Sequence, residues 1–332
     1  MQQRSEKTEL GALIALFAGA LCTGGAGVLV RLSETGPTAT AFWRGCLALP
    51  LLALWAWWEP RGAAAPAGQC APPRAWLASY RDPGFLLAGI FFAGDLALWH
   101  WSLLLTSIAA STLEASLAPL LVTLIAWLWW KERPTAAFLA ATALALVGMV
   151  LIVSPKFGQG GSAFLGDALG LGTACFFAAY LLAVARLRAR YGTGVVMLNL
   201  TVVFTVLLLP LALTQKFLPD TLRGWLTLAG CAVLAQVLGQ GLIAYALAHL
   251  RPTFSSLGLL VQTVGAALAA GWVLGERLAA IQVIGAVVII GAIALARAVR
   301  RPAPSEPVVA ARPPAMPEPA APAADSFGVI GD

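Results

Sequence analysis

The stretch STLEASLAPLLVTLIAWLWWKER (residues 111–133) has a counterpart later in the chain, SSLGLLVQTVGAALAAGWVLGER (residues 255–277). Both stretches begin with small polar residues and end on the same pair, Glu132–Arg133 and Glu276–Arg277. Between the two ends lies an apolar segment about one membrane span long. The chain therefore contains the same transmembrane pattern twice.

The composition agrees with a chain that lies mostly in lipid. Of its 332 residues 60% are hydrophobic and only 11% are charged, and a soluble domain could not bury that much apolar surface. Leu, Ala and Gly dominate without period-two alternation, which predicts helices rather than barrel strands. The predicted apolar spans are residues 10–31, 37–58, 84–106, 108–130, 135–154, 164–186, 194–214, 224–248, 253–274 and 278–299.

These spans form two sets of five, and because five is odd, the second set enters the bilayer inverted relative to the first. We therefore predict an all-α integral membrane protein with ten transmembrane helices in two inverted five-helix repeats, residues 8–155 and 162–300. Inverted repeats that enclose a site near the bilayer midplane are the architecture of many secondary transporters. Residues 302–332, rich in Pro and Ala, are predicted to form a disordered cytoplasmic tail.

Charge and cysteine usage narrow the partners. Lys and Arg concentrate in the connections on one side, which predicts a multi-pass protein of the inner membrane with both termini cytoplasmic. The net charge of +6 therefore reflects the Lys and Arg residues that mark the cytoplasmic side of the membrane, and no nucleic-acid partner is predicted. The five cysteines form no CxxC motif or Cys/His cluster, so no metal site is indicated. The chain has no GxxxxGK[ST] phosphate loop, so direct use of ATP is not expected and no cofactor is predicted.

The paired segments resemble a known family. APLLVTLIAWLWWKERPT (118–135), WVLGERL (272–278) and the spacing from Pro37 to Arg44 are similar to the EamA branch of the drug/metabolite transporter superfamily. The resemblance implies inverted repeats, a central substrate pocket and alternating access for small molecules, without specifying which. Thr263 stands where the pattern has the proline seen at Pro119, so the residue that would kink the ninth helix is missing here.

Ionisable residues inside spans are costly and mark candidate sites; those of the first half are Arg44, Asp95, His100 and Glu114. Asp95 or Glu114 could carry a coupling proton, or could bind the ammonium group of an amino acid or another cationic substrate. The alternative is a structural ion pair between Arg44 and a carboxylate, with Glu114 at a similar depth. For His100, a proton relay and an ordinary satisfied polar side chain remain equal alternatives.

The second half offers neutral amides at comparable depths. Gln236 and Gln240 lie four apart on one face of the eighth span, and Gln262 lies on the ninth. Hydrogen bonds that only pack helices are the alternative, worth roughly 0.6 kcal/mol each in a membrane. Charge on one side and amides on the other would suit a zwitterionic or polar organic solute.

Two aromatic residues complete the candidate set. Trp99 is four residues from Asp95 and shares its helix face, where its ring could contact a cationic or aromatic ligand. Tyr245 aligns with Trp101 in the repeat and is the corresponding candidate in the second half.

These features predict a secondary transporter that moves a small polar metabolite, an amino acid or related compound, as an exporter working by alternating access. An enzyme is not predicted, because no catalytic constellation accompanies the two histidines. The rival hypotheses are an intramembrane lipid-headgroup transferase and a non-transporting membrane scaffold. The expected partners are the substrate and the bilayer, with proton coupling through Asp95 as a sub-hypothesis and a monomer or homodimer as the assembly.

Overall fold

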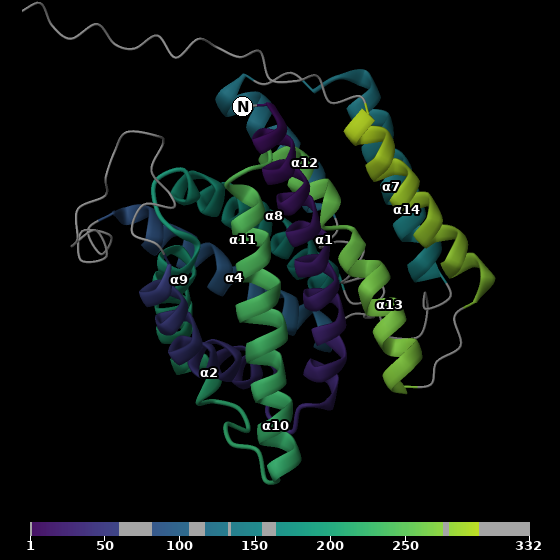
Figure 1. The fold of residues 1–332 in the computed structure, drawn as a ribbon. Coiled ribbons are helices and arrows are strands. Elements are labelled where there is room, and N and C mark those ends of the chain that lie inside the picture. The colour runs from purple at the N-terminus through teal and green to yellow at the C-terminus, as the bar shows by residue number, and fades with distance from the viewer. Residues whose placement is uncertain are drawn as a thin grey trace, which may run out of the picture. The chain divides into compact units, whose positions relative to one another are not determined.

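The computed structural model describes residues 2–59, 82–105, 117–131, 134–154, 164–274 and 279–298, and every regular element in these ranges is helical (Figure 1). Among the described residues, eight helices are long and apolar enough to cross a membrane, and the apolar helices Ala118–Leu128 and Ala136–Ile152 are shorter. The prediction of an all-helical membrane protein is confirmed. The predicted tail 302–332, the repeated Glu–Arg pairs and Glu114 fall outside the described residues.

The first half contributes five described helices. Their bounds are α1 Gln2–Leu32, α2 Pro37–Trp58, α4 Pro83–Leu105, α6 Ala118–Trp130 and α7 Ala136–Val153. Proline begins α2 and α4 and lies in the first turn of α6, where a missing backbone N–H costs nothing. α7 instead begins at Thr135, whose hydroxyl accepts a hydrogen bond from the Phe138 amide.

The second half is less regular. Its helices are α8 Phe164–Arg188, α9 Thr193–Ala212, α10 Leu222–Gly230, α11 Gly241–Leu247, α12 Pro252–Gly258, α13 Val261–Leu274 and α14 Ala280–Ala298. Between α10 and α11 the chain continues as a π-helix, η2 (Cys231–Gln240), so these three pieces form one continuous span, Leu222–Leu247. Such π-helical segments are rare and often lie at functional sites.

The ninth predicted span is broken although the expected proline is absent. α12 ends at Gly258 and α13 begins at Val261, and around this point amides bond three residues back, as in Leu260 N to Leu257 O at 3.1 Å and Gln262 N to Leu259 O at 2.9 Å. The substitution of Thr263 for proline therefore does not give a continuous helix here. The break lies before Thr263, in the segment Leu259–Leu260.

The helices of the two halves interleave. Among the described helices, the most extensive contacts are α4 with α8, α7 with α14, α2 with α9 and α1 with α13, and each pair joins one helix from either half. In Figure 1, α7 and α14 run side by side. Neither half therefore packs as a separate bundle of its own.

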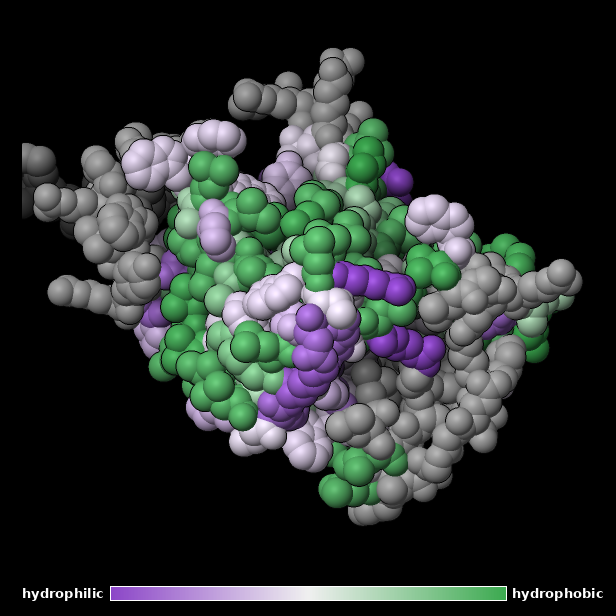
Figure 2. All heavy atoms as spheres, turned by 90° about the horizontal axis from the view of Figure 1, so that it is seen from below, coloured by the Kyte–Doolittle hydropathy of each residue, from purple (hydrophilic) through white to green (hydrophobic). Residues whose placement is uncertain are grey.

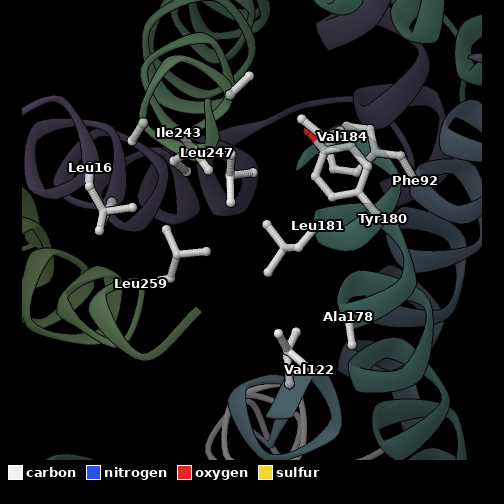
Figure 3. Packing of buried hydrophobic residues seen from close by; sticks show 14 of the residues in the cluster. Leu16, Phe92, Val122, Ala178, Tyr180, Leu181, Val184, Ile243, Leu247 and Leu259 are labelled. Atoms are coloured by element: carbon white, nitrogen blue, oxygen red, sulfur yellow. The ribbon is translucent and has the colours of Figure 1, made fainter. Parts of the chain in front are cut away.

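The buried side chains form one large apolar cluster that draws on both halves. In Figure 3, Leu16, Val122, Leu181 and Leu259 point toward one another from four different segments of the chain. Large apolar side chains also cover the outside, and Trp272, Val206 and Leu226 are among the exposed ones, as expected for a surface that faces lipid. From the end where α10 begins, hydrophilic side chains gather near the middle of the face, with hydrophobic ones around them (Figure 2).

Candidate functional site

Arg44 of α2 is the centre of the candidate site. Its side chain is buried, with 8% of the residue exposed, and its Nε donates a hydrogen bond of 3.1 Å to Oε1 of Gln236. The amide of Gln236 in turn donates from Nε2 to the hydroxyl of Thr201 on α9 at 3.0 Å. This second bond fixes which end of the amide faces Arg44, so the carbonyl oxygen is presented to the guanidinium.

The guanidinium of Arg44 lies over an aromatic ring. Its guanidinium carbon is 5.5 Å from the ring centroid of Phe92, within the range of a cation–π contact. Phe92 stacks on Tyr180 of α8 (Figure 3), with ring centroids 4.4 Å apart. The ring of Phe204 meets the Phe92 ring edge-on. The Tyr180 hydroxyl donates to Oε1 of Gln240 at 3.0 Å. Arg44 is therefore held by an amide at its edge and an aromatic stack at its face.

Asp95 brings the opposite charge to the same region. This carboxylate, on α4, is 8% exposed and lies within electrostatic range of Arg44. Two opposite charges that share a low-dielectric interior reduce the cost of burying each of them. The structure thus brings Arg44 and Asp95 together, whereas Glu114 lies outside the described residues.

The irregular segment η2 places both amides. Gln236 and Gln240 lie inside this π-helix, and both are buried, at 0% and 5% exposure. Each contacts a different partner, since Gln236 bonds to Arg44 and Thr201 and Gln240 bonds to Tyr180. The two amides of η2 thus contact residues of α2, α8 and α9.

Arg44 carries more donors than its bond to Gln236 uses. The Nε bond to Gln236 takes one of the five N–H donors of the guanidinium, and the two terminal nitrogens carry the other four. Two parallel donors of this kind match a carboxylate well. Chemically, the site offers a guanidinium, a carboxylate nearby and an aromatic surface.

The other predicted residues lie around this cluster or away from it. His100 is 2% exposed, its Nδ1 bonds to the Leu96 carbonyl oxygen, and its Nε2 has no partner among the described residues. Trp99 is half-buried and its ring meets the His100 ring edge-on. Gln262 lies near α1, with its Oε1 3.5 Å from the Thr23 hydroxyl.

Tyr245 belongs to a different region of the protein. It lies near the end of the eighth span, with its ring 4.8 Å from that of His249 and within electrostatic range of Arg188. The structure therefore does not bring Tyr245 into the cluster around Arg44.

Three residues of the cluster were missed by the sequence analysis, namely Phe92, Tyr180 and Thr201. None is ionised at neutral pH, and aromatic and hydroxyl residues in apolar spans are usually interpreted as packing. One available signal was the spacing of Phe92 from Asp95 on α4, because residues three apart share a helix face. No signal in the sequence identified Tyr180 as the partner of Gln240.

Comparisons with known proteins place the chain in a family. The sequence model of the EamA-like transporter family matches residues 10–154 and again residues 164–298. A known crystal structure superposes on 90% of this chain and 99% of its own, with a TM-score of 0.64 at 18% sequence identity, which shows a shared fold alone.

The curated relatives are transporters. The pseudopaline exporter of Pseudomonas aeruginosa is 27% identical over 57% of this chain and 65% of its own length. The riboflavin transporter of Vibrio cholerae is 30% identical over 59% of this chain and 66% of its own, so the matches span less than two thirds of either relative. An uncharacterised transporter of Archaeoglobus fulgidus is 26% identical over 82% of this chain and 91% of its own length.

The matching family is a transporter family, and the named relatives are an exporter and a transporter. The prediction of a transporter in place of an enzyme is therefore confirmed. The family predicted from the paired motifs is confirmed as well, because its model covers nearly all the residues before the tail. The chain belongs to the EamA-like transporter family.

Proposed function

We propose that the protein is a secondary transporter that moves a small polar metabolite across the inner membrane. The observation that carries this proposal is the buried Arg44, held by Gln236 and Phe92 beside Asp95. Charged groups inside a membrane are expensive and are retained where they serve a substrate or ion pathway. A non-transporting scaffold would not need these buried charges.

The substrate we propose is an amino acid or a related compound. The terminal nitrogens of Arg44 would bind its carboxylate in a bidentate manner. Asp95 would bind its ammonium group, and the Phe92–Tyr180 stack supplies an apolar surface for the remainder. The relatives named as a pseudopaline exporter and a riboflavin transporter support a polar organic solute.

We further propose ten spans in two inverted repeats, with repeats close to residues 8–155 and 162–300. Two separate matches to the family model support the duplication. The Lys and Arg distribution supports cytoplasmic termini, and the relative that is named as an exporter supports export. We propose that the protein is a monomer or a homodimer, and measuring its molecular mass in detergent distinguishes the two.

A direct test is transport by purified protein in proteoliposomes. Candidate amino acids are first screened by thermal stabilisation, and the compounds that stabilise are then measured by uptake. Arg44→Gln should abolish transport of a carboxylate-bearing solute, whereas Arg190→Gln, a change of an exposed arginine, serves as the matched control. Uptake that survives Arg44→Gln unchanged would contradict the proposed site.

Proton coupling through Asp95 is tested in the same vesicles. We expect an imposed pH gradient to drive transport in the parent protein and to have no effect on the transport that remains in Asp95→Asn, where loss of the carboxylate also weakens binding of the ammonium group. If transport is indifferent to both the gradient and the substitution, coupling at Asp95 is wrong.

A further inference from the structure

The N-terminus of α9 is capped by a side chain from the end of α2. The carboxylate of Glu59, directly after α2, accepts hydrogen bonds from the amides of Thr193 at 2.6 Å and Gly194 at 2.8 Å. The N-cap residue of α9 is Gly192, which has no side chain to perform this role. A carboxylate at a helix N-terminus is also favoured by the helix dipole.

The N-terminus of α2 is capped by a side chain from the end of α9. Oε1 of Gln215 accepts from the Thr38 amide at 3.0 Å, and Nε2 of Gln215 donates to the Thr38 hydroxyl at 3.0 Å. The N-cap residue of α2 is again a glycine, Gly36. Each helix of the antiparallel pair therefore obtains its N-terminal cap from beyond the C-terminus of the other.

The two capping sites match in detail. Gly36 and Gly192 have nearly the same backbone angles, with φ −61° and ψ 156° in one and φ −62° and ψ 159° in the other. A Cβ on Gly36 would lie 2.4 Å from Oε1 of Gln215, and one on Gly192 would lie 2.2 Å from Oε2 of Glu59. Glycine at both positions is what lets the capping side chain reach the helix end.

The two helices are also closely packed. Between the ends, a Cβ on Gly45 of α2 would lie 2.2 Å from the Thr205 hydroxyl of α9, and at the Glu59 end one on Gly194 would lie 2.6 Å from the backbone nitrogen of Ala56. α2 and α9 are thus in contact at both ends and between them. A gate that opened by separating these two helices would have to break a polar cap at one end and close packing next to it.

We propose that α2 and α9 move as one unit during transport, fastened at one end by Glu59 and at the other by Gln215. This inference rests on the proposed function, and it names which part of the site moves together, because Arg44 lies on α2 and its amide partner Gln236 bonds to Thr201 of α9. α2 belongs to the first half and α9 to the second. The two halves therefore do not rock against each other as rigid bodies, and access changes by movement of other helices around this pair.

Cross-linking at each end of the pair tests the proposal. In a variant whose natural cysteines are replaced by alanine, a short cleavable reagent with two thiol-reactive groups links Thr38→Cys to Gln215→Cys at one end and Glu59→Cys to Thr193→Cys at the other. Single-cysteine variants treated with the same reagent control for modification alone. We expect each linked protein, and the protein linked at both ends, to keep the transport rate of its unlinked form. Loss of transport on linking at either end, restored when the linker is cleaved, would overturn the proposal.

Distances measured without transport separate this proposal from the proposed function. Spin-label pairs at Trp58 and Arg190 and at Pro37 and Thr214, which flank the caps and leave Glu59 and Gln215 in place, should each give one narrow distance population, unchanged by a mixture of the protein amino acids. If no solute is transported by the parent, the proposed function fails, while an unchanged single distance at both ends still supports the paired unit. Two populations at either end would contradict the paired unit whatever the transport result.

Discussion

Gly148 of α7 and Gly285 of α14 lie against each other with nearly reciprocal geometry. A Cβ on Gly148 would lie 2.7 Å from the carbonyl oxygen of Gly285, and a Cβ on Gly285 would lie 2.5 Å from that of Gly148. The next turns match as well, since each added Cβ would also lie 2.9 Å from the isoleucine four residues after the opposing glycine, Ile289 or Ile152. Close backbone approach through small residues is how helices associate in lipid.

Gly148→Ala should therefore destabilise the protein. The added methyl group overpacks a backbone contact, at a cost of about 1–3 kcal/mol. Gly291→Ala, also on α14, is the matched control, because a Cβ there meets no atom within 4 Å. The control should be neutral or stabilising by about 0.5–1 kcal/mol, since alanine favours helix more than glycine does. Thermal unfolding in one detergent compares the two, and equal melting temperatures would contradict the contact.

Tyr180→Phe should weaken the site while leaving its packing intact. The substitution keeps the stack on Phe92 but removes the hydroxyl that bonds to Gln240, whose buried Oε1 then loses the Tyr180 donor. The expected loss of stability is about 1–3 kcal/mol. Phe177→Leu, which alters a half-buried neighbour in the same stack, controls for general effects on packing. A Tyr180→Phe protein as stable and active as the parent would show that the bond to Gln240 is dispensable.

Gln236→Leu should impair substrate binding more than folding. Leucine fills a similar volume but leaves Nε of Arg44 without its acceptor and Thr201 without its donor. Since the guanidinium is then free to turn, we expect a higher KM for the transported solute and a smaller change in maximal rate. Gln236→Glu keeps an acceptor for Arg44 and should recover binding in part. A change in maximal rate alone would argue against a role of Gln236 in positioning Arg44.

The sequence predicts the scaffold better than the site, and the reason is physical. Span length and apolar composition are set by the bilayer, so the helices could be located from the sequence alone. Arg44, Asp95, Gln236 and Gln240 could be singled out because a buried charge or amide in lipid is costly. Their partners could not, because the bonds from Gln236 to Arg44 and Thr201 depend on the tertiary crossing of helices and on the π-helical turn of η2.

The break in the ninth span shows a second limit. Proline is the residue that usually predicts a kink, and Thr263 gives no such signal. The chain nevertheless leaves the helix at Leu259–Leu260, two apolar residues that are both 2% exposed. Leucine is a good helix former, so the sequence of the span gives no signal for this turn.

Stability should depend on pH through Glu34, in the connection between α1 and α2. Its carboxylate accepts hydrogen bonds from the Thr221 hydroxyl and from the amides of Thr221 and Asp220. Led by the bond from the Thr221 side chain, these hold the pKa of Glu34 below its ordinary value. The carboxylate therefore stabilises the fold above the pKa of the unfolded chain, and this contribution is lost as pH falls through the lowered folded pKa.

Glu34→Gln isolates this effect. The variant should be less stable than the parent at neutral pH, and the difference between their melting temperatures should shrink as the solution is acidified. Glu59, the carboxylate that caps α9, is left intact in both proteins, so its titration is common to them. A difference that stays constant with pH would show that the charge of Glu34 makes no contribution.

Arg188 and Arg190 are two residues apart and should respond very differently to removal. Arg188 is 6% exposed, and it donates from Nε to the Ala244 carbonyl at 3.1 Å and from Nη1 to the Tyr191 carbonyl. Arg190 is largely exposed, and its contact is an ion pair with Asp82 at 3.8 Å. Arg188→Leu leaves the two carbonyls without the Arg188 donors and should cost about 1–3 kcal/mol. Arg190→Leu should cost about 0–1 kcal/mol, as for other exposed ion pairs. Chemical unfolding in mixed micelles measures the stability of both variants. Similar losses of stability would mean that Arg188 acts as a surface charge and that its bonds to the Ala244 and Tyr191 carbonyls do not stabilise the fold.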